Sequence, residues 1–130
     1  MPFNLAETFV ATTELELGTT LPTFYKQAMQ RDNGGEVEAA GDSWTLYPIA
    51  DTSDQRRLAR TANHIIKETQ SCRSWPNFPR SAVAIAGNGT GGQLVFIMDG
   101  SSLGLAVHVW SHETGIAAKV ANDFSELKPS

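Results

Sequence analysis

Two short apolar runs joined by a cluster of glycines constrain the fold of this chain more than any other feature. The runs cover residues 82–86 and 94–98, and both contain β-branched or aromatic side chains, which favour strands over helices. The glycines between the runs supply a turn. The pattern therefore predicts a β-hairpin over residues 81–100, and we expect the rest of the chain to pack on it.

The glycines of this turn also match a known cofactor motif. Gly87, Gly89 and Gly92 spell G-x-G-x-x-G, the fingerprint of a dinucleotide-binding loop. That fingerprint requires a helix directly after the glycines, because the pyrophosphate binds at the helix N-terminus. The residues that follow, QLVFIM, are strand formers and end at the turn signal Asp99-Gly100. The context favours a hairpin, and we expect no cofactor.

The length of 130 residues fits a single domain, residues 1–130, that buries about two-thirds of the surface of the unfolded chain. Cys72 is the lone cysteine, so an internal disulfide is not expected. No signal segment opens the sequence, and no apolar run approaches the ~20 residues that cross a bilayer. We expect a soluble, cytoplasmic protein without a membrane partner.

Charge is distributed unevenly along the chain. Residues 1–55 carry nine acidic and two basic side chains, whereas residues 56–80 carry six basic side chains and one acidic one. An acidic part next to a basic segment creates a field that selects charged partners, although salt screens it beyond ~10 Å. Solvated surface is the more common reason for such runs.

Helical periodicity predicts three helices in the first half of the chain. The first is expected over residues 4–14, with Asn4 as its N-cap and Gly18 as its stop. The second begins near Pro22 and ends at Asn33-Gly34-Gly35, whose residues tolerate a left-handed C-cap. The third is a single amphipathic helix over residues 53–69 with a basic outer face.

Strand composition or alternation marks four further segments, which are residues 36–40, 43–49, 105–110 and 116–120. Residues 71–80 are expected to form an irregular connection, and Asn122 to cap a final helical turn through Leu127. Strands that follow one another without alternating helices predict an α+β fold. We expect a mostly antiparallel central sheet of about five to six strands, with helices from both chain ends and the middle packed around it.

Four patches between residues 16 and 127 carry a resemblance to a known family. They are ELGTTLPTFYKQAMQRDNGG, the hairpin AVAIAGNGTGGQLVFIMD, the strand VHVWSHET and the closing segment VANDFSEL. Their order and spacing resemble those of the SMI1/KNR4 family, in the SUKH superfamily. The chain departs from the family pattern at Asn88 and Gly92, where the family tends to have acidic residues.

The resemblance implies an α+β fold without catalytic activity. Bacterial single-domain members act as immunity proteins of polymorphic toxin systems, in which they bind and neutralise a cognate toxin, often a nuclease, whereas fungal members are scaffolds in cell-wall regulation. A bare domain of this length resembles the bacterial members. The resemblance therefore implies an immunity protein with a toxin partner. The alternative is an intracellular adaptor of the SMI1/KNR4 type with a regulatory or cell-wall-related partner.

The residues themselves form no recognisable catalytic or metal-binding motif. Cys72 and His112 form a thiol–imidazole pair only if the fold brings them together, and a solitary cysteine is more often a small hydrophobic residue. His108 and His112 lie ~13 Å apart on an extended strand, too far for one metal ion. We expect no enzyme activity, no catalytic residue and no metal, with a small hydrolase that uses Cys72 and His112 as the alternative.

The candidate partner-binding site combines clustered acids with one exposed aromatic side chain. Carboxylates speed association with a basic nuclease, although solvated surface explains the same residues. Trp44 and Trp110 are expected in the core, whereas Trp75, between two prolines, is either a core residue or an interface anchor. The candidate residues are Glu36, Glu38, Asp42, Asp51, Asp54 and Trp75.

A competing interpretation is nucleic-acid binding along the basic segment. Arg56, Arg57, Arg60 and Lys67 place like charges on the outer face of the third expected helix, where a phosphate backbone binds. The acidic remainder of the chain and the lack of interleaved aromatic residues argue against this function. We therefore expect a protein partner and no nucleic acid.

Overall fold

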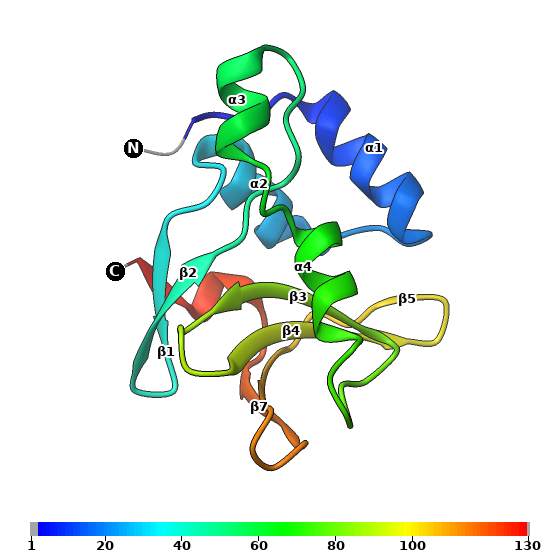
Figure 1. The fold of residues 1–130 in the computed structure, drawn as a ribbon, viewed down its shortest axis with the longest axis vertical. Coiled ribbons are helices and arrows are strands. Elements are labelled where there is room, and N and C mark those ends of the chain that lie inside the picture. The colour runs from blue at the N-terminus through cyan, green and yellow to red at the C-terminus, as the bar shows by residue number, and fades with distance from the viewer. Residues whose placement is uncertain (1–2, 130) are drawn as a thin grey trace.

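The protein has an α+β fold built on one curled antiparallel sheet (Figure 1). The structure is a computed structural model that describes residues 3–129. Its strands are β1 Glu36–Ala39, β2 Asp42–Leu46, β3 Ala82–Gly87, β4 Gly92–Asp99, β5 Ser102–Leu103, β6 Val107–Ser111, β7 Ala117–Ala121 and β8 Lys128–Pro129. Seven of them follow one another in the order β7-β6-β4-β3-β2-β1-β8, and β5 pairs with β4.

The α+β class is confirmed, but the expected five to six strands are too few, because the described residues form eight. The two extra strands, β5 and β8, are two residues long. A segment of two residues cannot show the alternation by which strands are recognised in a sequence.

The central hairpin is confirmed, with β3 and β4 joined by the glycine-rich turn. β4 lies between β3 and β6, and its consecutive residues Leu94, Val95 and Phe96 are all fully buried. Successive residues of a strand point to opposite faces, so both faces of β4 are covered. This double burial explains why the sequence of β4 is continuously apolar.

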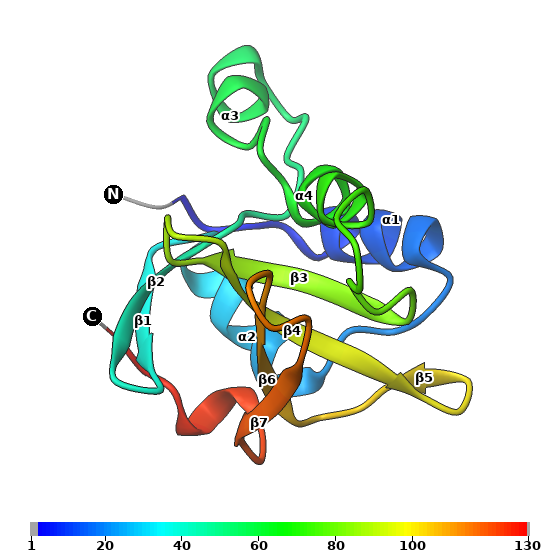
Figure 2. The same cartoon turned by 60° about the horizontal axis from the view of Figure 1, so that its bottom comes forward.

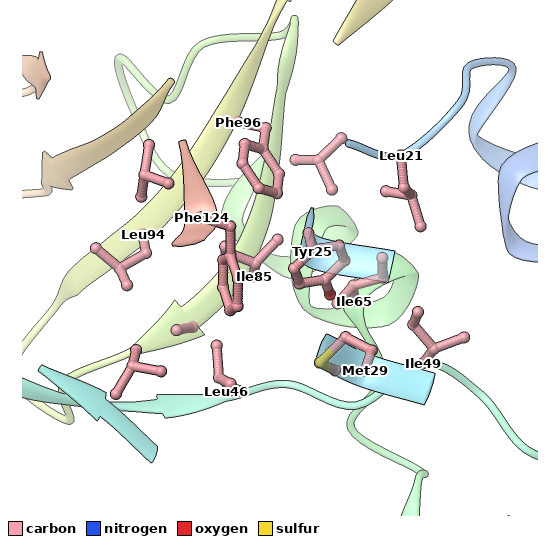
Figure 3. Packing of buried hydrophobic residues seen from close by; sticks show 14 of the residues in the cluster. Leu21, Tyr25, Met29, Leu46, Ile49, Ile65, Ile85, Leu94, Phe96 and Phe124 are labelled. Carbon is pink, nitrogen blue, oxygen red and sulfur yellow. The ribbon is translucent and has the colours of Figure 1, made fainter. Parts of the chain in front are cut away.

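The described residues form four helices, which are α1 Glu7–Leu17, α2 Thr23–Arg31, α3 Gln55–Arg60 and α4 Ile65–Cys72. Of these, α4 packs directly on β3, whereas α3 stands away from the sheet (Figures 1 and 2). The larger core contains Tyr25 and Met29 of α2 among Ile85, Phe96 and Phe124 (Figure 3). A smaller core contains Cys72, Phe78, Val95 and Trp110. Figures 1 and 2 place α3 and β7 at opposite ends of the molecule.

The single helix predicted over residues 53–69 is wrong, because the chain forms α3 and α4 with a break between them. Thr61 ends α3, and its hydroxyl lies 3.0 Å from the Asp51 backbone nitrogen, from which it accepts a hydrogen bond. His64 then caps α4 by accepting a hydrogen bond from the Lys67 backbone nitrogen. The apolar periodicity of the sequence continues through this break. It therefore gives no sign of the polar side chains that end α3 and begin α4.

The two predicted N-caps, Asn4 and Asn122, also differ from the structure. α1 begins after Ala6 without a side-chain cap, and the Asn4 carbonyl oxygen accepts a hydrogen bond from Arg57 instead. The final helical turn is η1 Phe124–Glu126, capped by Asp123 rather than Asn122. Two other predicted helix boundaries are closer, since Gly18 adopts φ 74° after α1 and α2 begins directly after Pro22. The C-cap of α2 is Asp32 in an extended conformation, so the left-handed cap predicted from Asn33-Gly34-Gly35 is not formed at the helix end.

At one edge of the sheet, β7 pairs only with β6 among the described strands. The register shifts between Val107 and His108, so the pairing contains an irregularity of the β-bulge type. Lys119, in the middle of β7, is exposed. The opposite edge is β8, which pairs with only Val37 and Glu38 of β1.

Candidate partner-binding surface

The candidate surface begins where α2 turns into β1, and Asn33 holds this corner. Its side-chain amide donates to the Ile49 carbonyl oxygen at 2.8 Å and accepts from the Ile49 backbone nitrogen at 2.8 Å. Asn33 is buried, and Gly34 and Gly35 follow it at φ 123° and 93°. Residues other than glycine rarely adopt such backbone angles. The Gly34-Gly35 pair therefore allows the chain to change direction between α2 and β1.

The hairpin of β1 and β2 divides the predicted acidic cluster between two faces. Glu36 and Glu38 lie opposite Thr45 and Ser43, and all four side chains are exposed. Asp42 lies opposite Ala39 in the alternate register, on the other face of the hairpin, where it accepts a hydrogen bond from Asn88 at 3.0 Å. The pleat therefore keeps Asp42 apart from the Glu36 and Glu38 carboxylates.

Asp51 is buried and committed to contacts within the protein. Its carboxylate accepts hydrogen bonds from Ser53 and lies 3.2 Å from Arg57 Nη1. Burial opposes ionisation, but the bonds from Ser53 and Arg57 outweigh it and lower the pKa of Asp51. The side chain of Asp51 is therefore a structural ion-pair partner with almost no exposed surface.

Asp54 is exposed, but it too has a local role. Its carboxylate caps α3 by accepting a hydrogen bond from the Arg57 backbone nitrogen at 2.8 Å. The five predicted acids therefore lie in four environments, and only Glu36 and Glu38 share one exposed face. Composition alone gives no signal that separates these environments.

Three arginines of the basic segment pack against Phe3 near the start of the chain. The guanidinium carbons of Arg56, Arg57 and Arg60 lie 5.6, 4.7 and 5.0 Å from the centre of the Phe3 ring. Cations over an aromatic face are attracted to it. These contacts give the arginines of α3 a role in holding the N-terminal segment.

A groove between α2 and β1 is a feature that sequence reasoning missed. Its volume is about 680 Å³, and its lining comes from α2, β1, β2, η1 and β8. The apolar residues among its lining are Phe24, Ala28, Met29, Val37, Leu46, Phe124, Leu127 and Pro129. Phe24 is half-exposed at this groove, but its exposure is visible only in the structure.

Trp75 combines the two roles considered for it. Its ring stacks on Trp110, with centroids 5.5 Å apart, and also lies 5.6 Å from the His112 ring. About 36% of the residue is exposed, whereas Trp44 and Trp110 are buried as predicted. One face of Trp75 therefore supports the small core, and the remainder is open to solvent.

The residues of the hydrolase alternative do not form an activated nucleophile. Cys72 is buried with Phe78, Val95 and Trp110, and burial, assisted by Glu68, raises the pKa of its thiol to about 11. Reactive cysteines have a lowered pKa and partial exposure. The environment of Cys72 is therefore that of a hydrophobic core residue.

Residues 3–129 show neither a metal-binding cluster nor a membrane-spanning helix. No three His, Cys, Asp or Glu side chains of this part of the chain gather in a way that suits a metal ion. None of its helices combines the length and the apolarity needed to span a bilayer.

Comparison with known proteins identifies one family. The model of the SMI1 / KNR4 family (SUKH-1) matches residues 5–128. No curated protein matches the sequence significantly. The matched range includes the hairpin of β1 and β2 and all residues that line the groove except Pro129.

Proposed function

Because the chain belongs to the SMI1/KNR4 (SUKH-1) family, we propose that it is a non-enzymatic immunity protein that neutralises a cognate bacterial toxin by stoichiometric binding. The observation that carries the proposal is the family match over residues 5–128. Family membership supports a binding role in general, and the toxin is the finer part of the proposal.

Two structural features support binding rather than catalysis. The thiol of Cys72 is buried with a raised pKa, so it is a poor nucleophile at neutral pH. The acids Glu36 and Glu38 lie on one exposed face of a short hairpin, where they attract a basic partner. A nuclease has a basic surface for its substrate, so we propose a nuclease toxin and a cytoplasmic site of action.

Sequencing the genes beside this one and co-expressing the protein with any toxin domain that they encode tests the proposal. We expect cells that carry both proteins to grow and the two proteins to elute together in gel filtration. Cell death together with separate elution would contradict immunity for that pair. The Cys72→Ala variant is expected to protect as well as the wild type, and loss of protection by that folded variant would favour the hydrolase alternative.

Gene deletion separates immunity from the adaptor alternative. An immunity protein is needed only when toxin-bearing competitors are present. A growth or envelope defect of the deletion strain in pure culture would instead favour an adaptor that binds one of the cell's own proteins.

A further inference from the structure

We propose that the groove between α2 and β1 binds a basic segment of the partner protein and accepts one large apolar side chain from it. This inference rests on the proposed protein-binding function. The groove shape accounts for the apolar side chain, and the charge at its rim accounts for the basic segment.

The floor of the groove is a buried apolar surface. Met29, Val37, Leu46 and Phe124 line it and belong to the larger core, so they are fixed by packing beneath. Phe24 lines the same groove with 49% of its surface exposed. A volume of about 680 Å³ lies within the range of about 300–1,000 Å³ that is usual for pockets that enclose ligands. An anchoring aromatic or aliphatic side chain fits such a site, as interface hot spots do.

The charges at the rim select the chemistry of the flanking residues. Asp32 and Glu36 line the groove at the corner between α2 and β1, together with Arg31. Both carboxylates are exposed, and neither forms an ion pair with another residue of the described range 3–129. Glu38, on the same exposed face of β1 as Glu36, does not line the groove and lies opposite Lys128 of β8. Acids therefore outnumber the single lining arginine, so a lysine or arginine beside the apolar anchor gains electrostatic attraction.

The corner that carries these acids is rigid. Asn33 lies between Arg31-Asp32 and the glycine pair, and its two hydrogen bonds to Ile49 fix the end of α2 against the segment after β2. A preformed site does not lose conformational freedom when its ligand binds. The groove is therefore able to bind a short segment without rearrangement of the fold.

Selection from a random twelve-residue peptide library tests the groove on the intact protein. We expect the enriched peptides to contain an aromatic or large aliphatic residue with a lysine or arginine within two positions of it. Their affinity, measured by fluorescence anisotropy, is expected to fall at least tenfold for Ala28→Trp, which fills the groove. The matched control is Ala11→Trp, on the exposed side of α1, and we expect it to bind as the wild type does.

Two further variants keep the test decisive. Gln27→Trp places the same bulk at an exposed lining position and replaces Ala28→Trp if that variant unfolds. The double variant Asp32→Asn/Glu36→Gln is expected to lower affinity about threefold or more at low salt, and Glu7→Gln/Glu16→Gln on α1 is its control. Enrichment of acidic peptides, no enrichment, or binding that resists the groove-filling variants would each overturn the proposal.

The outcome for the groove is separable from that for the proposed function. If a toxin complex forms and Ala28→Trp does not weaken it, the groove is not the docking site although the immunity function stands. If peptides bind the groove while no toxin is neutralised, the binding surface stands and the immunity function fails.

Discussion

Arg57 joins two distant parts of the chain, since its Nη1 atom lies 3.2 Å from Oδ2 of Asp51 and donates to the Asn4 carbonyl oxygen at 2.9 Å. Asp51 is 1% exposed, so removal of its charge takes away the buried carboxylate that faces the Arg57 guanidinium. We expect Asp51→Asn to lower the free energy of unfolding by about 2–3 kcal/mol at pH 7.

The contribution of Asp51 depends on pH in a defined direction. The pKa of Asp51 is lowered on folding, so its stabilisation is complete above the unfolded value of about 3.9 and is lost as the pH falls through the folded value. Urea unfolding at pH 7, 5 and 3 is expected to show that the wild type and Asp51→Asn converge only in acid. Asp54→Asn, at an exposed cap, is the control and is expected to change stability by much less. A constant difference at all three pH values would contradict this account.

Removal of the hydroxyl groups of Tyr25 and Tyr47 is expected to change the free energy of unfolding in opposite directions. Tyr25 is fully buried, and its hydroxyl has no hydrogen-bond partner among the described residues. Tyr47 donates to Gln93 Oε1 at 2.8 Å. Tyr25→Phe removes an unsatisfied polar group and is expected to raise the free energy of unfolding by about 1 kcal/mol, whereas Tyr47→Phe is expected to lower it by about 1 kcal/mol.

Burial raises the pKa of both phenols, and that of Tyr47 reaches about 12. Ultraviolet titration of the folded protein is therefore expected to show no ionisation of either phenol at pH 10.

Chemical denaturation of the Tyr25→Phe and Tyr47→Phe variants measures the two expected changes in the free energy of unfolding. A loss of stability in Tyr25→Phe would indicate that its hydroxyl has a partner in solution.

The turn between β1 and β2 contains a strained alanine. Ala40 and Gly41 adopt φ 53° and 75°, as in the two-residue turns that favour Asn-Gly. An alanine in this left-handed region costs about 1–2 kcal/mol. Ala40→Asn is expected to raise the free energy of unfolding by about 0.5–1 kcal/mol, measured by thermal or chemical denaturation. Ala118→Asn, on exposed β7, is the control, and an equal gain there would rule out turn strain as the cause.

The hairpin of β1 and β2 carries Glu36 and Glu38 on one exposed face, and we expect these charges to raise the rate of association with a basic partner. Glu36→Gln/Glu38→Gln is expected to lower the association rate with a basic toxin about threefold to tenfold at low salt and much less at high salt. Asp42→Asn, on the other face of the hairpin, is expected to associate as the wild type does. Stopped-flow fluorescence measures these rates. Equal rates for the wild type and the double variant at low salt would place the interface elsewhere, and the Trp75 loop is the next surface to test.

The sequence predicts the elements that local periodicity defines and misses those made by distant contacts. The apolar runs of β3 and β4 are visible because burial on both faces demands them. The break between α3 and α4 is not, because it depends on the hydrogen bond between Thr61 and the backbone of Asp51. The cap of η1 is Asp123 rather than Asn122 because both adjacent residues suit the role, whereas α1 begins after Ala6 without a side-chain cap.

The sequence names the acidic residues of the candidate site, but it does not show which of them share a surface. Five acids in the first half of the chain are equivalent in a count of charges, yet Arg57 and Ser53 draw Asp51 into the interior. The strand register separates Asp42 from Glu36 and Glu38. The groove is assembled from segments as far apart as Phe24 and Pro129, so no local pattern reports it.

The edges of the sheet bear on how the protein behaves when it is abundant. An unpaired strand invites a second chain to add to it, and short edges, lysines and bulges all discourage this. β8 is two residues long, and β7 combines an exposed Lys119 with a shifted register. We therefore expect copies of the protein to find little backbone on which to stack and to stay dispersed at high concentration. The proposed immunity function would need this property, because a binder that is consumed one molecule per target protects only as far as its supply extends.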